Sequence, residues 1–425
     1  MIDRRLFLGS AAGAVGLIAA GCAKSAGADS QSPATKPVGA PPPFSARNFT
    51  IAERDRRWSA VRERLRANGL AALIVPTSTH FTLNYAQYLS DAGFMLQGGV
   101  VLVADGDAYI FGAPPFPGKN PAWIANMLPP FGSFGSAASQ VLGAAGISSA
   151  KVGIVGAHAS KFGLNEFTAA GFFPASSFKD LIDGAPEVEL VDFTPDLAEV
   201  MLVKSSEEIA AMEQAAQFCE GVHRSILAKA RAGVTPFELN AHVGSLYANS
   251  MASPGVQILE SAPVPFGEGT VVNTEYGVKL AGGHTQGTLS FAFSPVSDET
   301  NSLAQVAERA FEASKSAAMP GTRFGDAVKA AEAIIDEAGY WNGFPVIHSM
   351  SPIALVGRVG MAPGMYQPVR GEEIILQSGM VLSFEANARK GQKAMVKVGG
   401  TGVVTDTGVR MLNTLGNTMQ VISAT

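Results

Sequence analysis

The sequence predicts a protein of the α/β class with two domains, in which helices alternate with short strands. Apolar residues recur at helical spacing in several segments, and short continuous apolar runs of strand character lie between them. The 425 residues exceed the length at which a single hydrophobic core stops growing. Residues 232–238 are echoed by residues 320–326, and each copy lies between helical segments. This weak repeat suggests two halves related by pseudo-two-fold symmetry.

The composition describes a globular protein with no affinity for nucleic acid. Hydrophobic residues make up 47% of the chain and charged residues 16%, which is enough apolar material for a large core. The net charge is −5, and beyond the first few residues there is no cluster of Lys and Arg. Because nucleic acids bind basic surfaces, we exclude them as partners.

Residues 1–28 indicate an export signal. Arg4 and Arg5 precede an apolar run that ends at Ala20, which is typical of a twin-arginine signal and too short for a membrane span. Cys22 follows a sequence similar to a lipoprotein cleavage box. We therefore expect a periplasmic or cell-envelope lipoprotein held to the membrane through lipidated Cys22. An ordinary secretory signal, and cleavage of a soluble protein at residues 26–28, remain alternatives.

The N-terminal domain is expected over residues 49–195, after a flexible linker at residues 29–48 that is rich in Pro, Ser, Ala and Gly. A helix should begin at Ile51, because Trp58, Val61 and Leu65 recur near helical spacing. Apolar runs predict the strands, with a hairpin turn at residues 105–107. The runs are residues 72–76, 98–103, 108–111 and 151–156.

The C-terminal domain is expected over residues 196–425 and begins with a long helix. Ser205 or Ser206 can cap its first turn, where Glu207 and Glu208 lie beside the positive end of the helix dipole. The helix should end near residue 230, before a glycine.

Several motifs of the C-terminal half occur in the order and spacing of one known family. They are residues 202–209, the two repeat copies, and residues 337–340, 378–385 and 403–408. Together they resemble the creatinase, prolidase and aminopeptidase P superfamily of metallopeptidases, and residues 79–85 are similar to the creatinase-type N-terminal domain. The resemblance covers about residues 51–415. It implies a creatinase-type N-terminal α/β domain, a pita-bread C-terminal domain and a homodimer.

The metal-ligand positions of this family are largely replaced. The family's dinuclear site uses two Asp, one His and two Glu, and the positions that match them are Glu275, Gln286, Pro352, Glu385 and Gly399. Only Glu385 is retained. Pro and Gly side chains offer a divalent ion no donor atom. Residues 360–363 also lack the histidine of the family's His-Glu-x-Pro motif. The sequence therefore predicts neither a bound metal nor another cofactor.

Four ionisable side chains remain near the expected pocket, and we take Glu275, His284, His348 and Glu385 as candidate catalytic residues. His284 lies two residues before Gln286, so both project from one face of the sheet if this segment is a strand. Gln286 is the candidate substrate-binding residue. The alternatives are a surface histidine for His284, a strand-end salt bridge for Glu275 and a structural ion pair for Glu385.

Creatinase itself cleaves a C–N bond without metal, using His and Glu, and the retained residues resemble that arrangement. The leading hypothesis is therefore a metal-independent hydrolase acting on a C–N bond of a small polar molecule. Either His348 or His284 would move the proton, and both Glu carboxylates would hold a polar or cationic group. A mononuclear Xaa-Pro metallopeptidase and a non-catalytic envelope binding protein remain open.

Overall fold

The computed structural model describes residues 49–425 except for short internal segments and the last residue. The segments are 78–84, 93–97, 113–122, 129–131, 157–172, 249–252, 261–263, 281 and 392–393. The predicted export signal, Cys22 and the linker lie outside the described residues, as does most of the N-terminal family motif at residues 79–85.

The N-terminal domain is built on a mixed sheet of six strands in the order β4-β3-β2-β1-β5-β6. The strands are β1 (Ala72–Pro76), β2 (Gly99–Val103), β3 (Ala108–Phe111), β4 (Asn126–Met127), β5 (Lys151–Ile154) and β6 (Glu189–Asp192). β1 runs antiparallel to β2 and parallel to β5. The predicted hairpin around residues 105–107 is confirmed by the pairing of β2 with β3.

Five helices of the described residues belong to this half of the chain, and α1 begins where the apolar spacing predicts. They are α1 (Ile51–Ala67), α2 (Tyr85–Ser90), α3 (Phe134–Ala144), α4 (Ala175–Gly184) and α5 (Thr194–Leu202). Thr50 caps α1 by accepting a hydrogen bond from the Glu53 amide, and Val61 and Leu65 are fully buried. The expected domain boundary at residue 195 falls within α5 and stays a prediction.

The C-terminal domain is built on one large sheet with the strand order β10-β13-β14-β9-β8-β7. The strands are β7 (Ser253–Glu260), β8 (Val271–Leu280), β9 (Gly283–Phe293), β10 (Ile347–Ser349), β13 (Val381–Lys390) and β14 (Ala394–Thr405). All these neighbours pair antiparallel. Two short strands extend the sheet and two form a separate hairpin. They are β15 (Gly408–Met411) and β16 (Gln420–Ile422), and β11 (Val359–Ala362) with β12 (Met365–Gln367).

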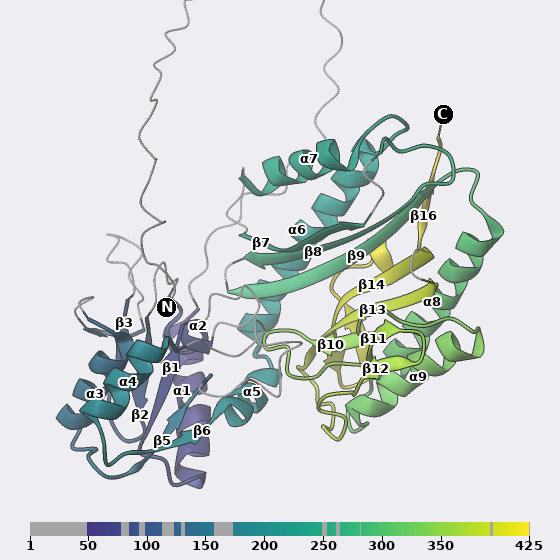
Figure 1. Ribbon diagram of the computed structural model, residues 1–425. Helices are drawn as coiled ribbons and strands as arrows, with labels where there is room; N and C mark the ends of the chain where they lie inside the picture. Colours follow the sequence, from purple (N-terminus) through teal and green to yellow (C-terminus); the bar gives the residue numbers. More distant parts are fainter. Residues whose placement is uncertain are drawn as a thin grey trace, which may run out of the picture. The chain divides into compact units, whose positions relative to one another are not determined.

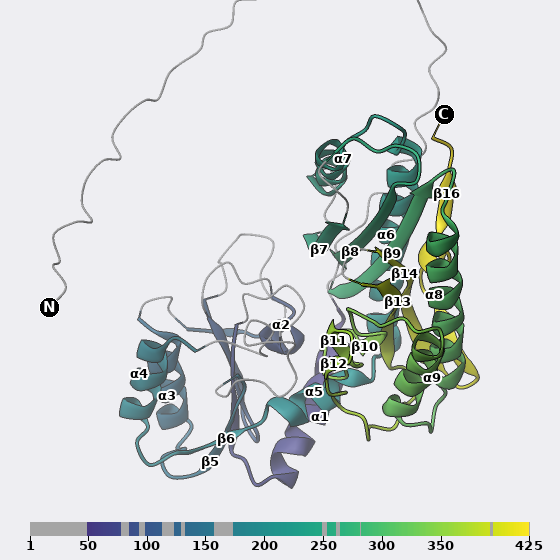
Figure 2. The same cartoon turned by 45° about the vertical axis from the view of Figure 1, so that its right-hand side comes forward.

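The helices α6 (Ser206–Lys229) and α8 (Asp298–Ala317) cover one face of this sheet (Figures 1 and 2). α6 lies against β8 and β9, while α8 lies against β13 and β14. Tyr276 on β8 meets the His223 ring of α6, and Phe384 on β13 meets the Phe311 ring of α8. Since side chains alternate along a strand, the neighbours of Tyr276 and Phe384 project from the opposite face.

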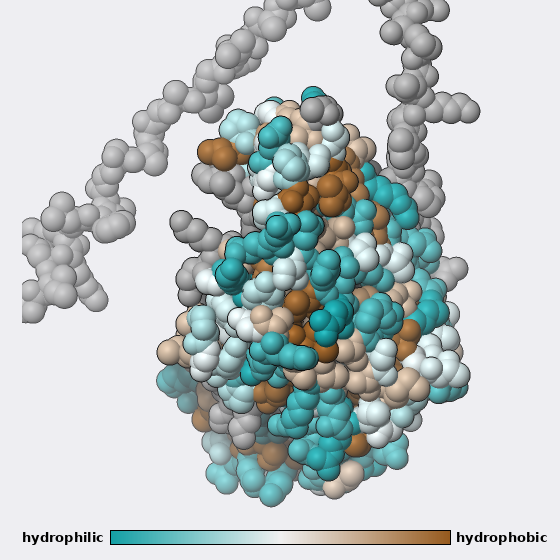
Figure 3. All heavy atoms as spheres, turned by 90° about the vertical axis from the view of Figure 1, so that its right-hand side faces the viewer, coloured by the Kyte–Doolittle hydropathy of each residue, from teal (hydrophilic) through white to brown (hydrophobic). Residues whose placement is uncertain are grey.

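The predicted repeat corresponds to two similar junctions between helices. Its copies end at the starts of α7 (Pro236–Ala248) and α9 (Phe324–Glu337), which follow α6 and α8 respectively. The face on which α8 and α9 lie carries mainly hydrophilic side chains, with hydrophobic ones in small groups (Figure 3). No helix in the described part of the chain has the length and apolar character that crossing a membrane requires.

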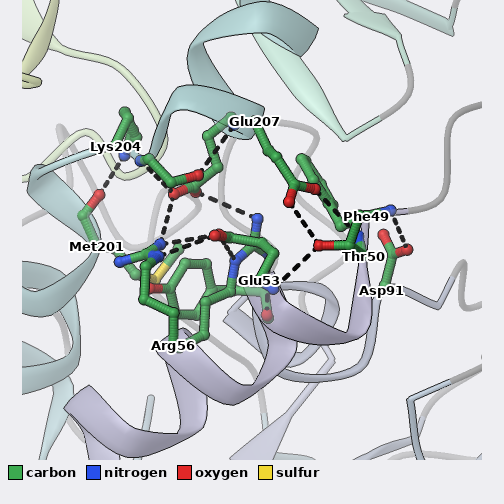
Figure 4. Close-up of polar contacts among 12 residues, drawn as sticks. Phe49, Thr50, Glu53, Arg56, Asp91, Met201, Lys204 and Glu207 are labelled. Carbon is green, nitrogen blue, oxygen red and sulfur yellow. Dashed lines mark hydrogen bonds and ion pairs between the residues drawn. The ribbon is translucent and has the colours of Figure 1, made fainter.

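Polar contacts join the first turns of α1 and α6 (Figure 4). The Glu207 carboxylate accepts hydrogen bonds from the backbone amide and the hydroxyl of Thr50. Arg56 forms ion pairs with Glu53 and with Glu208. The capping box predicted for α6 is confirmed, because Ser205 and Glu208 bond each other's backbone amides. These contacts fix the start of the helix that supports β8 and β9.

Candidate active site

The candidate residues lie on the sheet face that α6 and α8 leave uncovered. Glu275 on β8 is opposite Thr288 on β9, and Gln286 is opposite Gly277. On the other side of the sheet, Glu385 on β13 is opposite Gly399 on β14. Directly opposite residues of an antiparallel pair share a face. The strand register therefore brings four of the five family ligand positions to one surface, while the fifth, Pro352, lies in the loop after β10.

A buried ammonium lies against one of the two carboxylates. Lys397 is two residues from Gly399 on β14, so it shares the site face, and its Nζ contacts the Oε2 atom of Glu275. The side chains are 2% and 8% exposed. Burial and the nearby Glu385 charge raise the pKa of Glu275, against the opposing effect of Lys397. Without Lys397, Glu275 would be a buried carboxylate with no counterion.

The second carboxylate pairs with an imidazole. His348 on β10 is opposite Ser383, and its Nε2 lies 3.0 Å from Oε1 of Glu385. The His348 Nδ1 lies 2.9 Å from the carbonyl oxygen of Ser349. Both ring nitrogens thus face oxygen atoms, an arrangement that the doubly protonated ring satisfies when the Glu385 carboxyl is ionised.

The pKa values of this pair move in opposite directions. Burial alone would lower the pKa of His348, but the hydrogen bond and the charge of Glu385 outweigh it and raise that pKa. Burial alone would raise the pKa of Glu385, but the charges of Lys397 and His348 lower it. Both directions favour an imidazolium paired with a carboxylate, which is an ion pair of the kind named as the alternative for Glu385.

His284 and Gln286 lie on the same face of β9, as their spacing predicts. Each is 4% exposed, so His284 is not the surface side chain that was its alternative. The His284 Nδ1 lies 3.2 Å from the Ser351 hydroxyl. The Nε2 atom of Gln286 is buried and has no hydrogen-bond partner among the described residues. In this arrangement His284 is the imidazole that stands outside the two ion pairs.

The backbone at Gly399 leaves no room for a side chain. Its φ angle is +135°, in the region that favours glycine, and a Cβ atom there would lie 2.1 Å from the carbonyl oxygen of Phe384. A glutamate at this position would require the paired strands β13 and β14 to move apart. Within the described ranges, no group of three or more His, Cys, Asp or Glu side chains is arranged to hold a metal ion.

Sequence reasoning missed two lysines of this face, Lys397 and Lys279. Lys397 stands two residues before Gly399, and Lys279 stands four residues after Glu275. Counting in steps of two from the ligand positions along the two strands was the signal that would have found both. Lys279 is half-buried and lies opposite His284.

Residues 210–406 match the Metallopeptidase family M24. This segment belongs to that family. Among curated proteins, the putative dipeptidase YkvY of Bacillus subtilis (strain 168) is 27% identical over 228 residues, which are 50% of this chain and 59% of that protein. The alignment thus spans less than two thirds of the relative.

Solved structures share the fold over most of the chain. The dipeptidase PepE from Mycobacterium ulcerans has a TM-score of 0.69 at 19% identity, over 89% of this chain and all of its own. The prolidase from Thermococcus sibiricus has a TM-score of 0.70 at 16% identity, over 88% of this chain and all of its own. The expected architecture, an N-terminal mixed-sheet domain and a C-terminal pita-bread domain, is confirmed.

Removing the lysine of the buried Lys397–Glu275 pair should destabilise the protein strongly. We expect Lys397→Met to lower the free energy of unfolding by about 3 kcal/mol, because a buried acid is left without its partner. The double variant Glu275→Gln, Lys397→Met should recover much of this loss. Urea denaturation followed by circular dichroism measures both effects.

The matched control is Lys390→Met, which removes an exposed lysine that pairs with Glu299 at the surface. An exposed pair contributes about 1 kcal/mol or less. Equal effects of Lys397→Met and Lys390→Met would contradict a buried ion pair at Glu275.

The His348–Glu385 pair should stabilise the fold most in a window of mildly acidic pH. The raised pKa of His348 gives stability below its ordinary value of 6.5, which is lost as the pH rises through the raised value. The lowered pKa of Glu385 gives stability above 4.5, which is lost as the pH falls through the lowered value. The difference in unfolding free energy between the wild type and His348→Gln should therefore be largest between pH 4.5 and pH 6.5. A difference that changes in one direction only, from pH 3 to 10, would contradict the pair.

Proposed function

We propose that the C-terminal domain is a metal-independent hydrolase that cleaves a C–N bond of a small polar molecule. The observation that carries this proposal is the Lys397 ammonium, which lies buried against Glu275 on the face where the family pattern gathers its ligands. A cation supplied by the chain itself occupies the neighbourhood of the carboxylates, and a metal ion there would be repelled by it.

The residues present do not fit a two-ion centre. Gln286 offers a neutral amide in place of a carboxylate, Pro352 offers no donor, and Gly399 has a backbone on which no glutamate fits. Glu275 and Glu385 are both neutralised by protein cations. Our mechanism therefore uses only side chains of this chain.

His284 is the best-placed group for proton transfer. Both nitrogens of His348 are engaged in one ion pair and one backbone contact, whereas His284 is oriented through Nδ1 by the Ser351 hydroxyl. Neutral imidazole is a suitable base near pH 7. His284 would take a proton from water as the water oxygen bonds to the substrate carbon, and would return it to the nitrogen as the C–N bond breaks.

Lys397 and His348 would act through their positive charge. Both are held in place on a buried face by the carboxylates that neutralise them. Fixed cations in such surroundings stabilise an oxyanion more than mobile water does, because they need no reorganisation during the reaction. In this proposal the two ion pairs supply the electrostatic stabilisation, and His284 moves the proton.

A binding protein without catalysis is the second candidate. Two acids and two cations on the site face neutralise one another, and both His348 nitrogens are occupied. A face on which both acids are paired in this way can bind a ligand without transferring a proton to it. If the wild-type protein binds a compound and does not turn it over, this candidate is favoured.

Metal analysis with an activity screen tests the proposed hydrolysis. We expect purified full-length protein to carry less than a tenth of an equivalent of Mn, Zn or Co. It should release amine from dipeptides, N-acyl amino acids or ureido acids at the same rate with and without EDTA. A stoichiometric ion, or activity abolished by EDTA and restored by metal, would favour a mononuclear Xaa-Pro peptidase instead.

His284→Gln provides the residue test on any compound that is turned over. It should lower kcat by about a hundredfold, the usual contribution of a general base. His242→Gln on α7, which removes an imidazole bonded to Ser225 away from the site, should leave kcat unchanged. Equal activity of both variants would contradict the role of His284.

We also propose that the protein is an exported lipoprotein, a proposal that rests on Arg4, Arg5 and the sequence before Cys22. In a bacterium with the lipoprotein pathway, the wild type should fractionate with membranes, because a lipid chain with a second acyl group anchors stably. Cys22→Ala should appear in the soluble periplasmic fraction. Retention of Cys22→Ala in the membrane fraction would contradict lipidation at this residue.

A further inference from the structure

Lys279 is a cation of the site face for which the described part of the chain supplies no acid partner. It stands on β8 in step with Glu275 and Gly277, and it lies directly opposite His284 on β9. Opposite residues of an antiparallel pair have Cβ atoms about 5 Å apart, so the lysine and the imidazole are neighbours. Among the residues that the structure describes, Lys279 has no hydrogen-bond or ion-pair partner.

The two candidate acids of this face are paired with cations other than Lys279. Glu275 is paired with Lys397, and Glu385 is paired with His348. Burial lowers the pKa of Lys279 to about 8, which leaves the ammonium the main form at neutral pH. Among the described residues these pairs leave the Lys279 ammonium without an acid partner, so a ligand beside it gains most by bringing a negative charge.

Two buried hydrogen-bond donors on the same face as Lys279 have no acceptor among the described residues. The Gln286 side chain is 4% exposed, and its Nε2 has no partner among the described residues. Its cross-strand neighbour is Gly277, which has no side chain to cover the amide. The buried hydroxyl of Thr288, one step further along the same face, likewise finds no partner within the described ranges. Buried donors left without acceptors point to a ligand rich in oxygen.

We infer that Lys279 and Gln286 form a subsite for a carboxylate group of the small molecule that this domain binds. One carboxylate oxygen accepts from the Lys279 ammonium and the other from the Gln286 amide, two donors that project from adjacent strands. The inference rests on the proposed function for the placing of the reacting bond near His284. The sequence led us to expect that the two Glu carboxylates hold a polar or cationic group, but Glu275 and Glu385 already have protein partners, so the subsite is for an anionic group instead.

Binding of a matched pair of probes to the full-length protein tests this subsite. N-acetylglycine carries a carboxylate, and N-acetylglycinamide has nearly the same shape without the charge. By isothermal titration or NMR line broadening, the acid should bind at least about tenfold more tightly than the amide, as expected when one charge-assisted hydrogen bond is made. Acetate should compete with N-acetylglycine, and inorganic phosphate should compete no better than acetate.

Four variants separate the subsite from general effects. Lys279→Met and Gln286→Met should each weaken N-acetylglycine about tenfold, and Lys279→Arg should keep most of the affinity. Lys329→Met, which removes an exposed lysine of α9, should change nothing. Thermal melting shows that each variant is folded before its affinity is compared.

Each outcome supports or overturns the subsite. Equal affinity for acid and amide, no effect of Lys279→Met, or preferential binding of phosphate would overturn it. Binding of the acid with no turnover of any C–N compound would leave the subsite standing and remove the proposed hydrolysis. Turnover of neutral amides with no preference for acids would overturn the subsite and leave the proposed hydrolysis standing.

Discussion

The contact between the Lys397 ammonium and the Glu275 carboxylate, 122 residues apart in the chain, organises the polar face of the C-terminal sheet. It joins β14 to β8 across β9, so it forms only when three strands are in register. A buried acid requires a partner, and here the partner is a side chain where the family name implies a metal. The arrangement of the other residues on this face is consistent with this ion pair.

The neighbouring residues fit an arrangement in which the Lys397 ammonium is the counterion of Glu275. Glu385 takes His348 as its partner, so both acids are neutralised without ions. Gly399 lies where a glutamate would clash with Phe384, so the fourth carboxylate is excluded by the backbone as well as by the sequence. Lys279 has no acid partner among the residues that the structure describes, and this is the basis of the proposed carboxylate subsite. Substitutions at separate places thus form one consistent electrostatic arrangement.

The fold was predictable because its signals are local. The spacing of Val61 and Leu65, the Ser205 capping box and the apolar runs of the strands specify elements without knowledge of their partners. The site was predictable only in part. The positions of Glu275 and Glu385 follow from motifs, but their counterions depend on how distant strands align, and Lys397 looks in the sequence like any other lysine of a strand. Its role emerges from tertiary register.

Crystals of the full-length protein grown with excess manganese, and measured for anomalous scattering, test the central claim most directly. The account predicts ordered density for the Lys397 side chain, with Nζ in contact with Glu275 and no anomalous peak between Glu275 and Glu385. Two anomalous peaks bridged by these carboxylates, with the Lys397 side chain turned away, would contradict it.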